Sequence, residues 1–429
     1  MKKKILFLNG SLRDYRELAK KFIQDNYTII FEQTSNKLFE HLCNQHSLQE
    51  VDSLIHRFIK DFSDLCIQEN IAGIVSKADY PTNILKVALT EALQLPGPSL
   101  QTVLSLEHKF SARLIQKEHV PEAVPFFMLI NPDVFDLNTN SIEFPCMVKP
   151  VKSSFSRNVH IVSNVDELAY SLKNARFPIS FLHPFNFFLS KYLTLSEYDG
   201  SHLIAESLLT GYQITVEGFV YKGKITILGI VDSIMYPGTI SFERFEYPSS
   251  LEHPVQDRMC ALVSRLMQHI DFDNSLFNVE CVYNPSMDQI HIIEINPRIS
   301  SQFADLFERV DGINTYRILL DLAVGRKPEV KRKEGQFNIA ASCVLRLFED
   351  QFVEKIPSKS NLKYLVDLFP DMHVEIYAKE GKKLSAVDEL QDGKSFRYGI
   401  INLGAFDHED LMIKFHTAEK ILDFKFKSI

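Results

Sequence analysis

IHIIEINPRIS, the segment from Ile290 to Ser300, places three polar side chains in a run that is otherwise apolar. Glu294, Asn296 and Arg298 are spaced by two residues, and residues two apart in a β-strand face the same side of a sheet. A strand this apolar is expected to be largely buried, where each polar group needs a partner. The preceding segment indicates what that partner is.

A turn before this strand would fold it back onto an earlier strand. The turn-forming residues are Asn284, Pro285, Ser286 and Asp288. A hairpin centred near Met287 puts Glu280 directly across from Glu294, with Cβ atoms about 5 Å apart. Two carboxylates in this position repel each other, and burial strengthens the repulsion. A divalent cation such as Mg²⁺ relieves it, since Mg²⁺ accepts carboxylate oxygens and keeps room for phosphate oxygens.

These side chains together predict a platform for a metal ion and a polyphosphate. Glu280, Glu294 and the carbonyl oxygen of Asn296 would face the metal, and Arg298 offers a fork of donors suited to phosphate. The alternative is a solvated strand face with a surface salt bridge, which the apolar remainder of both strands disfavours. The prediction depends on register, because a shift by one residue would move Glu280 to the opposite face.

The composition is that of an ordinary globular protein. The chain has 429 residues, of which 45% are hydrophobic and 24% charged, with a net charge of −8. The negative charge argues against nucleic-acid and anionic-membrane partners. No run of roughly 18 apolar residues predicts a membrane span. Six scattered cysteines without a C-x-x-C motif are typical of reduced thiols, so we expect a cytoplasmic protein.

Strand and helix patterns alternate at the start of the chain. Strand-like runs lie at 4–8, 27–32 and 71–77, and helical patterns lie at 13–25 and 81–94 with a long amphipathic region before the third strand. Such alternation predicts a parallel sheet with helices on its faces. We therefore expect a Rossmann-like α/β domain over residues 1–105.

The middle of the chain predicts an α+β domain with two lobes. A helix at 105–120 precedes a strand at 144–150, a polar loop, a strand at 159–164 and a helix at 166–175. Mostly antiparallel strands follow, beginning with a hairpin whose turn is Lys222–Gly223. The expected class is α/β, with domains at 1–105, 106–330 (a small lobe, 106–205, and a larger lobe, 206–330) and 331–429, the last a small α/β unit.

A resemblance to a known family rests on four motifs in order. Glu280 in NVECV, followed by EINPR, resembles the metal-binding end of the ATP-grasp superfamily. Before it come Lys109 in the helical EHKFSARL, Lys149 in MVKP at a strand end, and Glu206 in IAESLLTG. The resemblance covers about residues 1–330. Within the superfamily the chain looks most similar to the carboxylate–amine ligases that join amino acids, the L-amino-acid ligases.

The resemblance implies a role for each motif. Lys109 and Lys149 would contact the α- and β-phosphates of ATP. Glu206 would lie near the adenine, whose edge the backbone from Ser207 to Leu209 would read. The hairpin would supply the ligands of Mg²⁺ or Mn²⁺ and the arginine that acts on the γ-phosphate, namely Glu280, Glu294, Asn296 and Arg298.

Two regions depart from the family pattern. Gln213 stands where relatives usually carry a glutamate for the ribose hydroxyls, and an amide still accepts from a hydroxyl without the charge. In the loop after Lys149, Ser154 and Ser156 match relatives, while Phe155 replaces a glycine. Glycine lets backbone N–H groups approach phosphates closely, so Phe155 bears on nucleotide affinity and turnover.

The function implied by the resemblance is an ATP-dependent carboxylate–amine ligase acting through an acyl phosphate. Its substrates would be an amino acid or small carboxylate and an amine, with no nucleic-acid or membrane partner and with a homodimer as the base-rate expectation. Arg244 and Arg309 are candidates for holding a substrate carboxylate. Two alternatives stay open: an enzyme like biotin carboxylase, and a non-catalytic ATP-binding protein.

Overall fold

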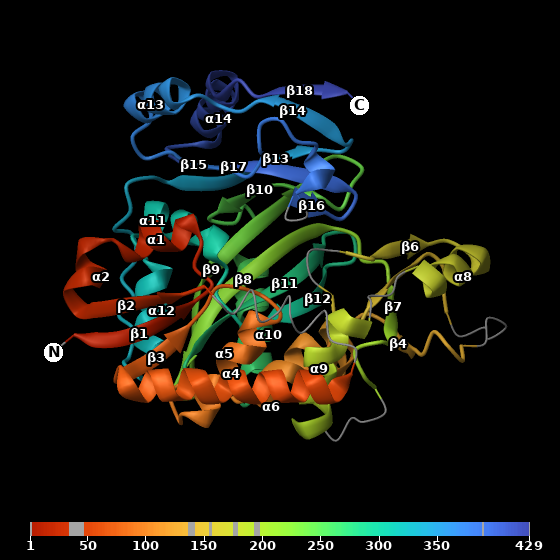
Figure 1. Ribbon diagram of the computed structural model, residues 1–429. Helices are drawn as coiled ribbons and strands as arrows, with labels where there is room; N and C mark the ends of the chain where they lie inside the picture. The colour runs from red at the N-terminus through yellow and green to blue at the C-terminus, as the bar shows by residue number, and fades with distance from the viewer. Residues whose placement is uncertain are drawn as a thin grey trace.

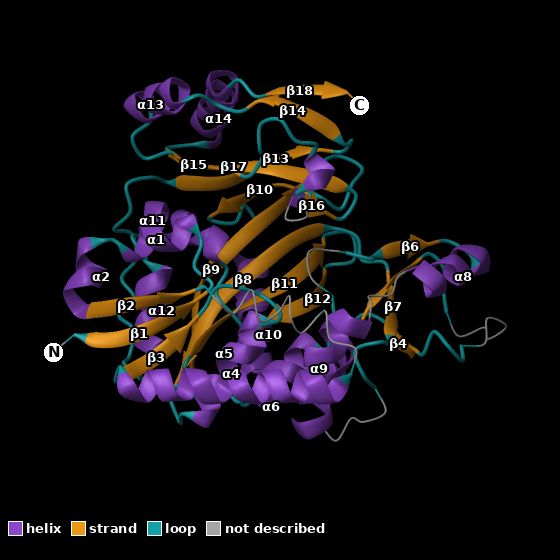
Figure 2. Ribbon diagram, in the orientation of Figure 1, coloured by secondary structure: helices purple, strands orange, loops and turns teal. Residues whose placement is uncertain are grey.

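The computed structural model describes residues 2–33, 47–135, 142–153, 157–174, 179–192, 198–387 and 390–428. Within these residues the strands form four sheets, of which a nine-stranded sheet is the largest. Figure 1 shows this sheet extending from the middle into the upper part of the molecule, with the N-terminal elements on one side and the last helix and strand of the chain above it. Figure 2 shows helices covering the sheets, as the predicted α/β class requires.

The N-terminal part is the predicted parallel sheet. Its strands have the order β2-β1-β3, and both pairings are parallel. Parallel strands are covered on both faces, and every residue of β1 from Ile5 to Leu8 is buried. The single helix expected at 13–25 is wrong, because it breaks at residues 19–20. The elements are β1 (Lys3–Leu8), α1 (Leu12–Leu18), α2 (Lys21–Asn26), β2 (Tyr27–Glu32), α4 (Leu48–Gln68), β3 (Ile71–Val75) and α5 (Thr82–Ala92).

A second, four-stranded antiparallel sheet forms a lobe that projects to one side (Figure 1). The helix expected at 105–120 is instead two helices that meet at His108. His108 has extended backbone, and its Nδ1 accepts a hydrogen bond from the Ser111 N–H at 3.3 Å, which caps the second helix. The elements are α6 (Leu100–Glu107), α7 (Lys109–His119), β4 (Phe127–Ile130), β5 (Cys146–Pro150), β6 (His160–Val162), α8 (Val165–Asn174), α9 (Ile179–Tyr192) and β7 (Leu203–Ser207).

The central sheet runs in the order β12-β11-β8-β9-β10-β13-β17-β15, with β16 paired to β17. Strand β10 is an element that the sequence reading did not contain. The sheet continues past residue 330, because β13, β15, β16 and β17 extend it, whereas β14 and β18 pair with each other in a separate two-stranded sheet. Its first part comprises β8 (Tyr212–Tyr221), β9 (Lys224–Met235), β10 (Phe242–Tyr247), α10 (His253–Gln268), β11 (Ser275–Asn284) and β12 (Gln289–Asn296).

The two faces of the central sheet have different surroundings. On one face, α10 packs its buried residues Met259, Val263 and Leu266 against strand residues such as Val279 and Ile292. The opposite face carries the polar side chains of the hairpin, and farther along it is covered by the helices that follow β12. The helices and the remaining C-terminal elements are α11 (Ala304–Asp311), α12 (Thr315–Ala323), β13 (Ile339–Leu347), β14 (Gln351–Lys355), α13 (Lys359–Leu368), β15 (His373–Ile376), β16 (Gln391–Asp392), β17 (Ser395–Ala405), α14 (His408–Leu422) and β18 (Lys425–Ser428).

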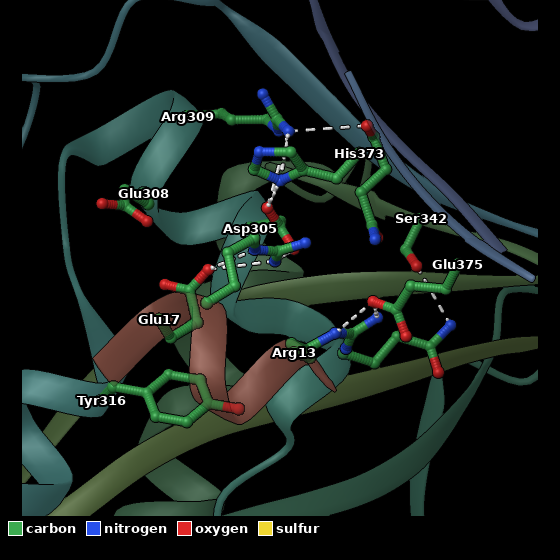
Figure 3. Close-up of polar contacts among 12 residues, drawn as sticks. Arg13, Glu17, Asp305, Glu308, Arg309, Tyr316, Ser342, His373 and Glu375 are labelled. Atoms are coloured by element: carbon green, nitrogen blue, oxygen red, sulfur yellow. Dashed lines mark hydrogen bonds and ion pairs between the residues drawn. The ribbon is translucent and has the colours of Figure 1, made fainter. Parts of the chain in front are cut away.

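A cluster of buried ion pairs joins three parts of the molecule. Figure 3 shows helix α1, helix α11 and strand β15 meeting there. Arg13 bonds Glu375 at 2.6 Å, and Asp305 accepts from Arg16 at 2.8 Å and contacts His373 at 2.6 Å. We call these five residues the interdomain cluster. Breaking a buried ion pair on one side costs about 3–5 kcal/mol, so the cluster holds the N-terminal part against the central sheet and its C-terminal extension.

A close backbone contact supports the same junction. A Cβ built on Gly73 in β3 would lie 2.5 Å from the carbonyl oxygen of Ala323 in α12. Glycine therefore allows the parallel sheet to approach α12. The chain thus brings the loops at the carboxyl end of β3 toward the polar face of the central sheet.

No helix within the described residues is both long and apolar enough to cross a bilayer. The five cysteines in those residues are free thiols.

Candidate functional site

The hairpin of β11 and β12 places Glu280 directly opposite Glu294, as predicted. The route to this pairing differs from the prediction. Near the turn, Asn284 pairs with Gln289 and Cys281 pairs with Ile292, and that register alone would match Glu280 with Ile293. A β-bulge at Ile293 adds one residue to β12 and shifts the register. The bulge therefore creates the carboxylate pair.

The two carboxylates of this pair have opposite protonation tendencies. Burial, followed by the charge of Glu294, raises the pKa of Glu280 to about 8. Burial would also raise the pKa of Glu294, but Lys109 and Lys149 outweigh it and hold the value at about 2. One proton or one cation shared by the pair would satisfy both groups.

Two amide side chains contact the carboxylate pair. Asn296 Nδ2 lies 3.2 Å from Glu280 Oε1 and 3.4 Å from Glu294 Oε1, and it donates to Asn278 Oδ1 at 2.9 Å. Gln213 Nε2 donates to Glu280 Oε2 at 3.0 Å. The nitrogen of Asn296, rather than its predicted carbonyl oxygen, faces the acids, so a cation there would require a rotation of this amide.

The predicted phosphate lysines are both present, and each is paired with an acid. Lys109 Nζ lies 3.1 Å from Glu294 Oε2, and the two side chains keep 16% and 30% of their exposure. Lys149 Nζ lies 2.6 Å from Glu206 Oε2, and both of these side chains are buried. Lys109 is thus an accessible cation beside the carboxylate pair, whereas Lys149 is held deeper.

Glu206 is fully engaged inside the protein. Besides Lys149, it accepts from Arg113 Nε at 2.6 Å. Burial would raise the pKa of Glu206, but Lys149 and Arg113 lower it to about 2. Its carboxylate therefore orients Lys149, and its predicted place beside an adenine stays a prediction. The following residue, Ser207, already donates its N–H to the carbonyl of Phe126 at 3.0 Å.

Arg298 lies just after β12 and reaches across to the N-terminal part. Its guanidinium contacts Asp79 Oδ2 at 3.1 Å. The side chain of Arg298 keeps 21% of its exposure and that of Asp79 keeps 26%. Burial would raise the pKa of Asp79, but Arg298 and Lys152 lower it to about 2. Arg298 is thus near the carboxylate pair and accessible, as a phosphate-binding arginine must be.

The remaining predicted residues have mixed outcomes. Ser154 and Ser156, together with Phe155, lie outside the described residues. Leu209 lies in the link between β7 and β8, and its role toward a base stays a prediction. Arg244 and Arg309 each have carboxylate partners of their own, Glu243 and Glu246 for the first and Asp305 and Asp371 for the second.

Sequence reasoning did not identify three residues that contact these groups. Asp79 pairs with Arg298, Arg113 contacts both Glu206 and the bulge, and Glu217 accepts from the N–H of Ser300 at 3.2 Å. Glu217 lies fully buried on β8, and burial raises its pKa well above the usual range. Their partners are many residues distant in sequence, so no spacing rule indicates them. Only the position of Asp79 at the end of a parallel strand gave a signal, since ligands gather at that edge.

The donor set fits a magnesium ion that is shared with phosphate. Among the described residues, no group of three or more histidine, cysteine or acidic side chains is arranged to hold a metal by itself. Glu280 and Glu294 provide two carboxylates, and Mg²⁺ is typically bound by one or two carboxylates plus substrate phosphates. Burial and the charge of Glu294 raise the pKa of Glu280, and a divalent cation bound to the pair would favour its ionised form.

The amino-acid comparisons place an established domain over these residues. Residues 142–306 match the family model described as ATP-grasp domain. A curated protein, the arginine-specific carbamoyl phosphate synthase large chain of Lactiplantibacillus plantarum, is 24% identical over 317 residues. The match covers 69% of this chain and 27% of that protein, so the chain spans about a quarter of its relative.

Solved structures share the whole fold at low identity. An L-amino acid ligase from Bacillus licheniformis has a TM-score of 0.71 at 15% identity, covering 99% of both chains. The biotin carboxylase domain of Hydrogenobacter thermophilus 2-oxoglutarate carboxylase is described as a dimer with MgADP and bicarbonate. It has a TM-score of 0.66 at 15% identity, and the match covers 100% of this chain and 91% of that chain. An Aspergillus clavatus N5-carboxyaminoimidazole synthase with ADP has a TM-score of 0.65 at 11% identity, and the match covers 98% of this chain and 99% of that chain.

Proposed function

Since residues 142–306 match the ATP-grasp domain and the whole chain shares the fold of ATP-dependent ligases, we propose that it is an ADP-forming ligase that joins a carboxylate to an amine through an acyl phosphate. The acid is an amino acid or a small carboxylate. The observation that carries the proposal is the pair Glu280–Glu294, whose members lie directly opposite each other across the hairpin, with Glu294 Oε2 3.1 Å from Lys109 Nζ. A pair of acids with a lysine and an arginine beside it suits a triphosphate and its metal.

The side chains of the site would exchange internal partners for those of the nucleotide. Lys109 would leave Glu294 for a phosphate oxygen, which frees that carboxylate for Mg²⁺ or Mn²⁺. Lys149 would bind phosphate while Glu206 and Arg113 hold it in place. When bound, the metal supplies positive charge between the carboxylates and the phosphate oxygens.

The reaction needs charge stabilisation more than a protein nucleophile. A carboxylate oxygen of the substrate attacks the γ-phosphorus, and ADP leaves with the electrons of the broken P–O bond. The amine nitrogen then attacks the acyl carbon, phosphate leaves, and the amine proton passes to solvent. Arg298, released from Asp79, would stabilise the negative charge on the transferred phosphoryl group in both steps.

An amide product is favoured by similarity to an L-amino acid ligase over 99% of both chains. The biotin-carboxylase-like activity is the second candidate, supported by a TM-score of 0.66 to a biotin carboxylase domain. A non-catalytic nucleotide-binding protein would not need an accessible arginine, here Arg298, beside the carboxylate pair. A homodimer and a cytoplasmic location stay predictions.

The test is a turnover screen with purified protein. The protein is incubated with Mg-ATP and pools of amino acids, and ADP, phosphate and product mass are measured. We expect ADP and phosphate in equal amounts with a new amide. ADP formation that requires bicarbonate and biotin would replace the proposal by the second candidate. ADP binding without turnover in any pool would replace it by a nucleotide-binding role.

A further inference from the structure

The β-bulge in β12 decides which way Glu294 points. Ile292 and Ile295 both lie on the apolar face that α10 covers, although they are three positions apart in the strand. In a regular strand, residues two apart share a face, so Glu294 would join Ile292 in that apolar layer. The extra residue Ile293 turns Glu294 to the polar face, opposite Glu280. Glu280 and Glu294 therefore form the carboxylate pair only while the bulge is maintained.

Arg113 on helix α7 binds the backbone at this bulge. Its Nη1 donates to the carbonyl oxygen of Ile292 at 2.9 Å, and its Nη2 donates to that of Ile293 at 2.8 Å. Successive carbonyl groups of a regular strand point in opposite directions, so one guanidinium reaches both only where the strand is irregular. Since β12 is the edge strand of the sheet, these carbonyls have room for an external donor.

The third arm of the same guanidinium extends to the other lobe. Its Nε donates to Glu206 Oε1 at 2.6 Å, and Glu206 Oε2 contacts Lys149 at 2.6 Å. Gln116, one helical turn on, also accepts from Arg113. Arg113 is only 2% exposed, so it cannot contact substrate. Its N–H groups donate to the two carbonyl groups at the bulge, to Glu206 and to Gln116 of its own helix.

We propose that Arg113 is the positioning residue of the carboxylate pair. It holds the bulge that keeps Glu294 opposite Glu280, and through Glu206 it fixes Lys149. This rests on the proposed function, because it assigns the site a metal and a nucleotide. The planar fork of arginine is required, since a lysine keeps the charge beside Glu206 but cannot donate along two parallel directions to consecutive carbonyls.

The experiment compares Arg113→Lys with Arg13→Lys in the full-length protein. Arg13 is a matched control, because it is equally buried and bonds Glu375 in the interdomain cluster, away from the hairpin. Mn²⁺ and Mn-ADP binding are measured by calorimetry and by electron paramagnetic resonance, with thermal unfolding in parallel. We expect both variants to lose thermal stability, and only Arg113→Lys to lose about 10- to 100-fold in Mn²⁺ affinity, the usual cost of removing a residue that orients metal ligands.

A second variant separates positioning from general stability. Deleting Ile293 removes the extra residue, so that the regular register itself puts Glu294 opposite Glu280. We therefore expect Arg113→Lys combined with this deletion to recover most of the lost Mn²⁺ affinity. If Arg113→Lys alone does not fold, the double variant carries the test, and a double variant that fails to fold or to bind Mn²⁺ overturns the proposal.

The outcomes are distinct from those of the proposed function. Arg113→Lys binding Mn²⁺ as tightly as the unchanged protein would overturn the positioning role while leaving the ligase proposal intact. If the unchanged protein bound neither Mn²⁺ nor Mn-ADP, both proposals would fall. Loss of turnover with normal Mn²⁺ binding in Arg113→Lys would also count against a role in positioning the metal pair.

Discussion

The interdomain cluster and the carboxylate pair of the hairpin are both rich in charge, yet they are built differently. In the cluster, Asp305 is only 3% exposed and has fixed partners in Arg16 and His373. In the hairpin, the Glu294 side chain keeps 30% of its exposure and pairs with Lys109, while Glu280 forms no ion pair with any of the described residues. Charges that are fully paired hold the fold together, whereas charges left incompletely compensated are available to a ligand.

The difference predicts where a charge-removing substitution acts. A neutral isostere in the interdomain cluster removes one half of a completed pair and leaves the other half buried, so it costs stability. A neutral isostere in the hairpin removes an oxygen ligand that the metal needs, so it costs function instead. Three substitutions test this, in order of the expected change in free energy.

Asp305→Asn is expected to have the largest effect, on stability. It leaves Arg16, His373 and Arg309 without their shared carboxylate, and we expect a loss of about 3–5 kcal/mol in the free energy of unfolding at pH 7, measured by urea denaturation. If the variant were as stable as the unchanged protein, the interdomain cluster would not be what holds these parts of the fold together.

The same substitution has a definite pH dependence. Burial would raise the pKa of Asp305, but His373, Arg16 and Arg309 hold it well below its usual range. A carboxylate with a depressed pKa stabilises the fold above its ordinary pKa, near 3.9, and that contribution is lost as the pH falls through the lower folded value. The stability difference between the unchanged protein and Asp305→Asn should therefore be full at pH 7 and should shrink below about pH 4.

Glu294→Gln is expected to abolish function while preserving the fold. Turnover should fall by about 100-fold or more, which corresponds to about 2.7 kcal/mol in the barrier. The thermal unfolding temperature of the nucleotide-free protein should change little, because the ion pair lost with Lys109 is partly exposed and such pairs contribute little to stability. Steady-state turnover and calorimetry check this, and wild-type turnover would remove Glu294 from the site.

Much of the fold was predictable because it follows from local patterns. Alternation of strands and helices predicted the parallel N-terminal sheet, and turn chemistry predicted the hairpins at Lys222–Gly223 and at residues 285–288. The break at His108 was not predicted, because the helical pattern of residues 105–120 continues across it and no proline or glycine interrupts that pattern. Tertiary packing and a histidine cap decide that boundary instead.

The carboxylate pair was predicted, but for an incomplete reason. Counting from Met287 gave the correct partners only because the bulge at Ile293 compensates for a turn whose true centre lies half a residue earlier. A signal for the bulge was present: the buried apolar positions of β12 change from even (Ile292) to odd (Ile295). The contacts that hold the bulge and Arg298 come from α7 and from the loop after β3, and no local pattern indicates such distant partners.

Gln213→Glu is expected to have the smallest effect and to sharpen the comparison most. Gln213 donates to Glu280, so a glutamate there replaces a donor by a third carboxylate. In the metal-free protein this should cost about 1 kcal/mol of stability. It should raise Mn²⁺ affinity by about threefold to tenfold, because affinity for a hard cation grows with the ligand charge.

A matched control shows whether the gain belongs to the hairpin. Gln302 lies on the same side of the central sheet but donates to Ser342 Oγ at 3.1 Å, beyond the carboxylate pair. Gln302→Glu adds the same charge, so a general electrostatic attraction would raise Mn²⁺ affinity equally in both variants. We expect a gain only in Gln213→Glu, because only there does the added carboxylate lie against Glu280, where it can join the oxygen ligands of the cation. Equal gains, or none in Gln213→Glu, would mean that the hairpin is as fully compensated as the interdomain cluster, and the contrast between the two regions would no longer explain where the ligand binds.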